Sequence, residues 1–282
     1  MRTSELILDI YRKIISLNVP GEGIPVNLRQ KTIIGTVQDD PFDCWVGDLL
    51  NEVLDGYEVF HSGKLTTPDI VIRSKVTGQC VGFEVKKLIQ QKNGSDSRGL
   101  TMDYNSCLPC GKTFIKVGDN TVEIPCYYLF ALLNQQSTAI KTLIVMDGDF
   151  LNYDVDLHKE SKISNYTEYN HGPYGEGSVR HRRMYTYPNP LDSKISLFFE
   201  RFLYVCKLSD IQGVDGLNGR YDLVVRKDRF GNSFKYSVID LVNKETEISH
   251  VELSGIFDGC KQRKPKPRTA AMPIIPPFLG HF

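Results

Sequence analysis

The sequence predicts an α/β (α+β) protein in which helices flank a central mixed β-sheet. Two observations favour this fold class. Apolar residues recur at helical spacing in two segments near the start of the chain. Later segments either alternate with a period of two or form short, fully apolar runs, which is typical of strands that are buried on one face or on both.

Three helices are predicted from apolar stripes. The first stripe covers residues 6–17, and Pro20 follows it closely. The second covers residues 43–54, with Asp43 as a suitable N-cap. Apolar residues at helical spacing predict a third helix over residues 195–206.

The strands are predicted from β-branched residues and a period of two. They cover residues 57–60, 69–73, 80–86, 127–133, 142–146, 221–226 and 234–242. The first three form a meander with a turn at residues 75–78, and the last two form a hairpin. Because the strands over 127–133 and 142–146 are apolar throughout, we expect them at the centre of the sheet.

The composition is that of a folded protein, with 282 residues of which 41% are hydrophobic and 24% charged. We expect one domain over residues 1–258, with an inserted loop region around 152–190, and a basic, proline-rich, extended and mobile tail over 259–282. That tail holds five lysines and arginines and no acid, which leaves 29 positive against 34 negative residues before it. Charge is therefore segregated along the chain.

Several classes of protein are disfavoured. No apolar run approaches the roughly 20 residues that cross a bilayer, so we expect no membrane association and a cytoplasmic location. Seven scattered cysteines indicate reduced thiols, and Cys107 and Cys110 lack the second ligand pair of a zinc site. The glycine-rich residues 213–219 lack the lysine and hydroxyl of a phosphate-binding loop, so no nucleotide cofactor is implied.

One group of residues carries a chemical prediction. Asp69 begins a predicted strand, and Glu84-Val85-Lys86 ends the next. Antiparallel pairing across the short turn returns Glu84 to the neighbourhood of Asp69, and alternation places Glu84 and Lys86 on one face. The pattern of an acid two residues before a lysine also occurs at 160–162 and 192–194. Of these three occurrences, only Glu84-Val85-Lys86 follows a strand that begins with Pro68-Asp69.

Two carboxylates on a rigid edge suit Mg²⁺, which keeps several waters and leaves room for phosphate oxygens. The metal would neutralise charge that develops on phosphorus, and it would lower the pKa of its water. A neighbouring lysine can orient that water. The predicted reaction is therefore hydrolysis of a phosphodiester.

These residues resemble the motif of the PD-(D/E)XK nuclease superfamily, in particular that of type II restriction endonucleases. The resemblance covers residues 43–150 and is carried by Pro68, Asp69, Glu84 and Lys86. It implies a restriction-endonuclease-like fold, with Mg²⁺ bound by Asp69 and Glu84 and water served by Lys86. Cleavage of double-stranded DNA would leave a 5′-phosphate and a 3′-hydroxyl. In this family the preceding helix often contributes an acid near the metal, and Glu52 is the position that fits.

DNA contacts are expected from two loop segments and the tail. Arginine and asparagine side chains can read base edges, and glycines allow close approach to phosphates. The loop that follows the catalytic strand offers Asn105, Ser106 and Lys112, and the inserted region offers Asn170, Arg180, His181, Arg182 and Arg183. Residues 261–268 of the tail would contact phosphates without reading sequence, or serve only to solubilise the chain.

The sequence therefore predicts a site-specific deoxyribonuclease of a restriction-modification system, acting as a homodimer with one active site on each strand of a palindrome. Three alternatives stay open. A junction or repair nuclease on the same fold would cut by structure rather than by sequence. A noncatalytic DNA-binding protein would use the basic segments alone. Finally, Asp69 and Glu84 could be ordinary acids at the ends of strands, with Lys86 solvated.

Overall fold

The computed structural model describes most of the sheet and its helices. The described residues are 3–29, 33–34, 37–38, 41–62, 66–90, 111–151, 184–186, 201–214, 217, 221–227, 230–242, 261–263 and 272–279. All structural statements below refer to these residues.

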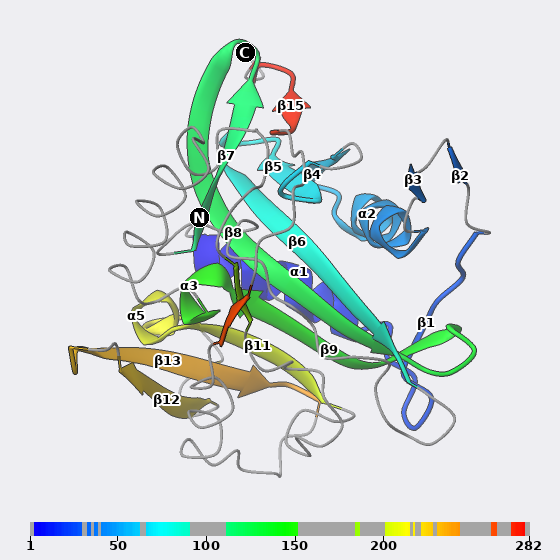
Figure 1. Cartoon of the computed structure of the whole chain (residues 1–282), viewed down its shortest axis with the longest axis vertical. Helices are drawn as coiled ribbons and strands as arrows, with labels where there is room; N and C mark the ends of the chain where they lie inside the picture. Colours follow the sequence, from blue (N-terminus) through cyan, green and yellow to red (C-terminus); the bar gives the residue numbers. More distant parts are fainter. Residues whose placement is uncertain are drawn as a thin grey trace.

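A large mixed β-sheet forms the centre of the molecule (Figure 1). From edge to edge its main path is β12 (Asp222–Lys227), β13 (Ser233–Asp240), β11 (Phe202–Lys207), β9 (Ala139–Asp147), β8 (Asn120–Leu133), β6 (Cys80–Ile89), β5 (Ile70–Ser74) and β4 (Tyr57–His61). The β6/β8 and β9/β11 pairs are parallel, and the other neighbours on this path are antiparallel. The predicted α/β class with a central mixed sheet is therefore confirmed.

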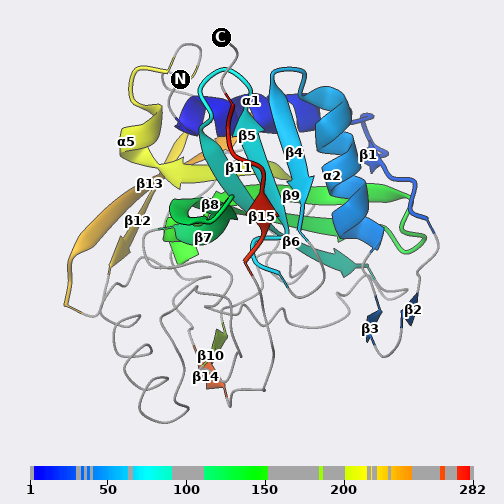
Figure 2. The ribbon, with the colours of Figure 1, turned by 90° about the horizontal axis from the view of Figure 1, so that it is seen from above.

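Two amphipathic helices cover one face of this sheet. In Figure 2, α1 (Thr3–Ile15) and α2 (Pro41–Val53) lie on the same side of the strands. Their apolar stripes pack against strand side chains that point to the helical face of the sheet, such as Phe83 and Leu129. These are alternate residues of each strand, because successive side chains point to opposite faces. The Tyr11 hydroxyl donates a hydrogen bond of 2.6 Å to the Phe202 carbonyl, which joins α1 to β11. Within the described part of the chain, no helix is long and apolar enough to span a membrane.

The remaining elements are short or lie beside the main path. Two four-residue helices, α3 (Gly148–Leu151) and α5 (Leu208–Ile211), directly follow β9 and β11. The additional strands are β1 (Ile24–Pro25), β2 (Ile33–Ile34), β3 (Val37–Gln38), β7 (Lys112–Val117), β10 (Met184–Thr186), β14 (Lys261–Arg263) and β15 (Ile274–Ile275). β1 pairs with β9, β2 with β3, β7 with β8, and β10 with β14.

The helix predicted over residues 195–206 is wrong for its second half. Residues Phe202–Lys207 form β11, which lies between β9 and β13. Its residues 202–206 are buried regardless of the face to which they point, as expected of a central strand. A short apolar run of this kind fits either a helix or a strand that is buried on both faces. This segment is a strand because it pairs with β9 and β13.

Part of the segment predicted as a tail pairs with the sheet. β15 pairs in parallel with β7, and the Lys116 and Gly118 amides donate to the carbonyls of Pro273 and Ile275. The buried Arg73 side chain donates to the Pro276 carbonyl. The segment is rich in proline, as expected, but Ile274 and Ile275 lie between Pro273 and Pro276 and form a short strand. One of the two side chains is buried.

Removing that buried side chain should destabilise the fold. Ile275 is 1% exposed and packs in a small apolar cluster with Ile115 of β7 and Val71 of β5. We expect Ile275→Ala to lower the free energy of unfolding by about 2–5 kcal/mol, because a buried cavity is created. Ile274→Ala is the matched control, since Ile274 is 71% exposed. Urea denaturation of both variants provides the measurement, and equal losses of stability would contradict the docking of this strand.

Candidate catalytic site

The sheet brings together Asp69, Glu84 and Lys86. β5 and β6 are antiparallel with Ile70 opposite Phe83, so Asp69, immediately before β5, continues this register to face Glu84. Val85 is buried in the core beneath the helices. Glu84 and Lys86 therefore extend from the other face of β6. This is the convergence that the length of the turn predicted.

The three side chains are in direct contact. The Lys86 Nζ donates to Glu84 Oε1 at 2.5 Å and lies 3.9 Å from Asp69 Oδ2. The backbone amide of Val85 donates to Asp69 Oδ2 at 2.7 Å. Because β5 begins only at Ile70, the Asp69 carboxylate occupies the place of a further strand residue beside β6. The edge of β6 thereby fixes the orientation of that carboxylate.

A glycine allows the segment before Asp69 to approach β6. Gly82 lies on the same face of β6 as Glu84, and a Cβ atom built on it would lie 2.8 Å from Cγ of Pro68. Carbon atoms do not approach so closely, so any side chain at position 82 would displace Pro68. Gly82 is thus a structural requirement for the position of the neighbouring Asp69.

The electrostatics of this cluster reflect burial and an excess of acids. Burial, followed by the neighbouring Glu84 carboxylate, raises the pKa of Asp69 well above its ordinary value, against the opposing effect of Lys86. Burial alone would lower the pKa of the Lys86 ammonium. Glu84 and Asp69 outweigh that effect and leave the pKa of Lys86 raised, so this side chain is a cation at neutral pH.

Of the two acids on α2, Asp43 acts electrostatically on this cluster, and Glu52 lies farther along the helix. The charge of Asp43, in the first turn of α2, raises the pKa of both Asp69 and Lys86. Glu52 is exposed near the other end of α2, and among the described residues no hydrogen bond or ion pair joins it to the cluster. The two acids are nine residues apart. About 100° per residue therefore places them on opposite sides of the helix.

The sequence predicts Asp43 only as an N-cap, whereas α2 begins two residues earlier, at Pro41. The spacing of Asp43 from the apolar residues of α2 indicated to which side of the helix it points. Asp43 precedes the buried Val46 by three residues and the buried Leu50 by seven, which is the phase of the apolar stripe. Glu52 lies outside that phase.

The donors of this cluster fit a small, hard cation. Glu84 is 4% exposed, and its Oε2 has no hydrogen-bond partner within the described residues. A buried carboxylate oxygen without a partner is costly, and a cation with its waters would satisfy it. Of the acids, only Asp69 and Glu84 would bind directly. The described ranges contain no group of three or more histidine, cysteine or acidic side chains arranged to hold a metal.

The predicted DNA-binding residues lie mostly outside the described residues. These are Asn105, Ser106, Asn170, Arg180, His181, Arg182 and Arg183. Lys112 is described, lies at the start of β7, and forms an ion pair of 2.6 Å with Glu123 of β8. Both side chains are roughly half exposed, so this pair is open to solvent.

The arrangement can hold a hydrated divalent cation beside an ammonium group, at the edge of a rigid strand. Such a site is suited to reactions at phosphate, where negative charge must be neutralised and water must be oriented. No protein-family model, no curated protein and no solved structure matches this chain. The chemistry of the described residues therefore carries the functional argument.

Proposed function

We propose that this chain is a Mg²⁺-dependent endonuclease of the restriction type, with a restriction-endonuclease-like arrangement of the PD-(D/E)XK superfamily. It would hydrolyse phosphodiester bonds of double-stranded DNA as a site-specific deoxyribonuclease. The observation that carries this proposal is the contact of Lys86 with Asp69 and with Oε1 of Glu84, whose buried Oε2 has no hydrogen-bond partner within the described residues.

Each residue of this cluster has a distinct role in the proposal. Asp69 and Glu84 supply the carboxylate oxygens that hold Mg²⁺, and the Val85 amide fixes the orientation of Asp69. When bound there, Mg²⁺ would stabilise the charge that develops on phosphorus and acidify a water. The Lys86 ammonium donates to Glu84 Oε1 and lies beside Asp69, so it would orient the attacking water and a phosphate oxygen close to these two carboxylates.

The DNA partner and the homodimer belong to the same proposal. A symmetric dimer would place one Asp69, Glu84 and Lys86 cluster against each strand of a palindromic target. The inserted region around residues 152–190 would supply the base contacts that make cleavage specific to sequence.

Digestion of a plasmid of known sequence tests the proposal. We expect discrete fragments with Mg²⁺, no cleavage with EDTA, and fragment ends that carry a 5′-phosphate and share one sequence. Cleavage only at junctions, flaps or lesions would indicate a structure-specific nuclease instead. Salt-sensitive DNA binding with no hydrolysis in Mg²⁺ or Mn²⁺ would indicate a noncatalytic DNA-binding protein and overturn the proposal.

The two acids of α2 should differ in their effect on cleavage. Asp43 influences Asp69 and Lys86 electrostatically, whereas Glu52 is exposed near the other end of the helix. We expect Asp43→Asn to lower the cleavage rate about 10–100-fold, the usual effect of losing a residue that supports metal ligands. Glu52→Gln should leave the rate close to that of the wild type, because no contact joins Glu52 to the cluster within the described residues. Single-turnover cleavage compares them, and a larger loss in Glu52→Gln would restore Glu52 as the helical acid.

A further inference from the structure

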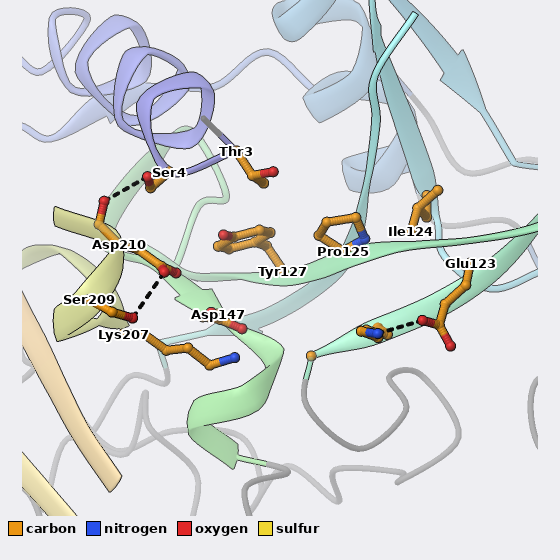
Figure 3. A pocket seen from close by; sticks show the side chains of 12 residues that line it. Thr3, Ser4, Glu123, Ile124, Pro125, Tyr127, Asp147, Lys207, Ser209 and Asp210 are labelled. Carbon is orange, nitrogen blue, oxygen red and sulfur yellow. Dashed lines mark hydrogen bonds and ion pairs between the residues drawn. The ribbon is translucent and has the colours of Figure 1, made fainter. Parts of the chain in front are cut away.

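A polar cavity lies on the same sheet, at the ends of the parallel strands β9 and β11. It has a volume of about 510 Å³. Figure 3 shows Asp147, Lys207 and Tyr127 around this space, with Ser4 of α1 and Asp210 of α5 beside it. Carboxyl ends of neighbouring parallel strands are a frequent place for ligands, because both chains turn away there and leave room.

Asp147 and Glu84 occupy different faces of the sheet. Asp147 pairs with Tyr127 of β8, which belongs to the core beneath the helices, whereas Glu84 pairs with Tyr128. Adjacent residues of a strand point to opposite faces. The cavity is therefore separate from the proposed catalytic cluster.

The cavity carries more acids than bases. The Lys207 Nζ forms an ion pair of 3.2 Å with Asp149 Oδ2, which also accepts a hydrogen bond from the Tyr236 hydroxyl. Lys112 is paired with Glu123 at the rim. Both lysines of this group thus have a carboxylate partner.

Asp147 has no cation as a partner among the described residues. Asp147 is 6% exposed, and its Oδ1 accepts one hydrogen bond of 2.8 Å from the backbone amide of Asp149. The described residues supply no hydrogen bond to its Oδ2 and no ion pair to either oxygen. Because Asp147 lines the cavity, a ligand that donates hydrogen bonds there would complete those of its Oδ2.

The backbone at Gly111 packs closely against the Asp147 carboxylate. Gly111 approaches so closely that a Cβ atom on it would collide with Asp147 Oδ1. Asp210, at the other side of the cavity, accepts only a hydrogen bond of 3.2 Å from Ser209 at its Oδ1, while the Ser4 hydroxyl donates to the Asp210 backbone carbonyl. Asp210 is thus a second carboxylate at this cavity without an ion pair in the described part of the chain.

We propose that this cavity binds a small organic cation whose ammonium or guanidinium group donates hydrogen bonds to the free oxygen of Asp147. Among the described residues, Asp147 and Asp210 form no ion pair, and their carboxylates give this part of the cavity lining a negative charge that such a group complements. The volume accommodates a short alkyl chain behind the charged group. This site is independent of the proposed nuclease activity.

Binding should depend on pH through Asp147. Burial raises the pKa of Asp147 to about 7, with smaller raising effects of Asp149 and Asp210 and lowering effects of the Asp149 amide and Lys207. Below that pH the carboxyl is protonated and loses the negative charge that attracts the donor group of the ligand. The affinity should therefore be about a hundredfold lower at pH 5 than at pH 8, because the ionised fraction falls by that factor.

Calorimetric titration with n-butylguanidinium, n-butylammonium and neutral n-butylurea tests the site on the full chain. We expect at least one of the two cations to bind at pH 8 about 10–100-fold more tightly than the urea, the usual effect of a charge-assisted hydrogen bond. Asp147→Asn should lose this difference. Asp119→Asn, an exposed acid in the β7–β8 turn, is the matched control and should keep it.

Each outcome decides the proposal. Preferential cation binding that rises from pH 5 to pH 8 and is lost in Asp147→Asn supports it. If that variant does not fold, the wild-type pH profile and the comparison with n-butylurea still decide. Equal binding of the cations and the urea, cation affinity that does not change with pH, or no binding of either cation at pH 8 would overturn it.

Discussion

Glu84→Gln is expected to slow Mg²⁺-dependent DNA cleavage about a thousandfold while leaving the fold and DNA binding intact. The substitution keeps the shape of the side chain but removes the charge beside Lys86 and Asp69. Loss of a metal ligand forfeits several kcal/mol of charge stabilisation in the transition state, and each 1.4 kcal/mol is worth about tenfold in rate. Single-turnover plasmid cleavage measures the rate, and gel shifts without Mg²⁺ measure binding.

Glu22→Gln is the matched control for this substitution. Glu22 is an exposed glutamate in the turn that follows α1, and its variant should cleave at the wild-type rate. Wild-type cleavage by Glu84→Gln would reject the assignment of the site even if the chain proves to be a nuclease. Weakened DNA binding by Glu84→Gln in the absence of metal would instead indicate damage to the fold.

Asp147→Asn should make the protein more stable at pH 8 than the wild type, by up to about 4 kcal/mol. The unfolded chain releases the Asp147 proton near pH 3.8, whereas the folded chain retains it to about pH 7. The folded state therefore loses stability as the pH rises between these values, by about 1.4 kcal/mol per unit. Asparagine cannot ionise, so the variant escapes this loss.

Urea denaturation at pH 4, 5.5, 7 and 8 measures the effect. The wild type should show a decline in stability from pH 4 to pH 7 that is absent or much smaller in Asp147→Asn. Asp119→Asn is again the control, since its exposed side chain should leave the pH dependence unchanged. Parallel pH profiles of the wild type and Asp147→Asn would show that Asp147 ionises normally in the fold.

The sequence predicted the proximity of Asp69, Glu84 and Lys86 because that proximity depends on local geometry. Asp69 and Glu84 are joined by a single tight turn, so the length of the turn and the alternation of side chains determine their register. By contrast, neither β7 nor the part of β8 before residue 127 was predicted from the sequence. The signal for this hairpin was the alternation from Lys112 to Val117 before a two-residue turn that contains Gly118, whose φ is 59°.

Features that depend on distant pairing could not be predicted in the same way. β11 is a strand because β9 and β13 lie on either side of it, and β13 follows it by many residues in the chain. The cavity at Asp147 and Lys207 likewise requires β9 and β11 to be adjacent and parallel. Periodicity reports the burial of a segment and says nothing about its neighbours.

The pairing of β15 with β7 has a consequence for synthesis of the chain. During translation, β7 and its hairpin partner β8 leave the ribosome long before Ile275 does. Until then, Ile115 and Val71 lack the side chain that completes their cluster, and one edge of β7 is open to pairing with other chains. Among the described strands, this edge of β7 is thus covered by β15 only after nearly the whole chain has been made.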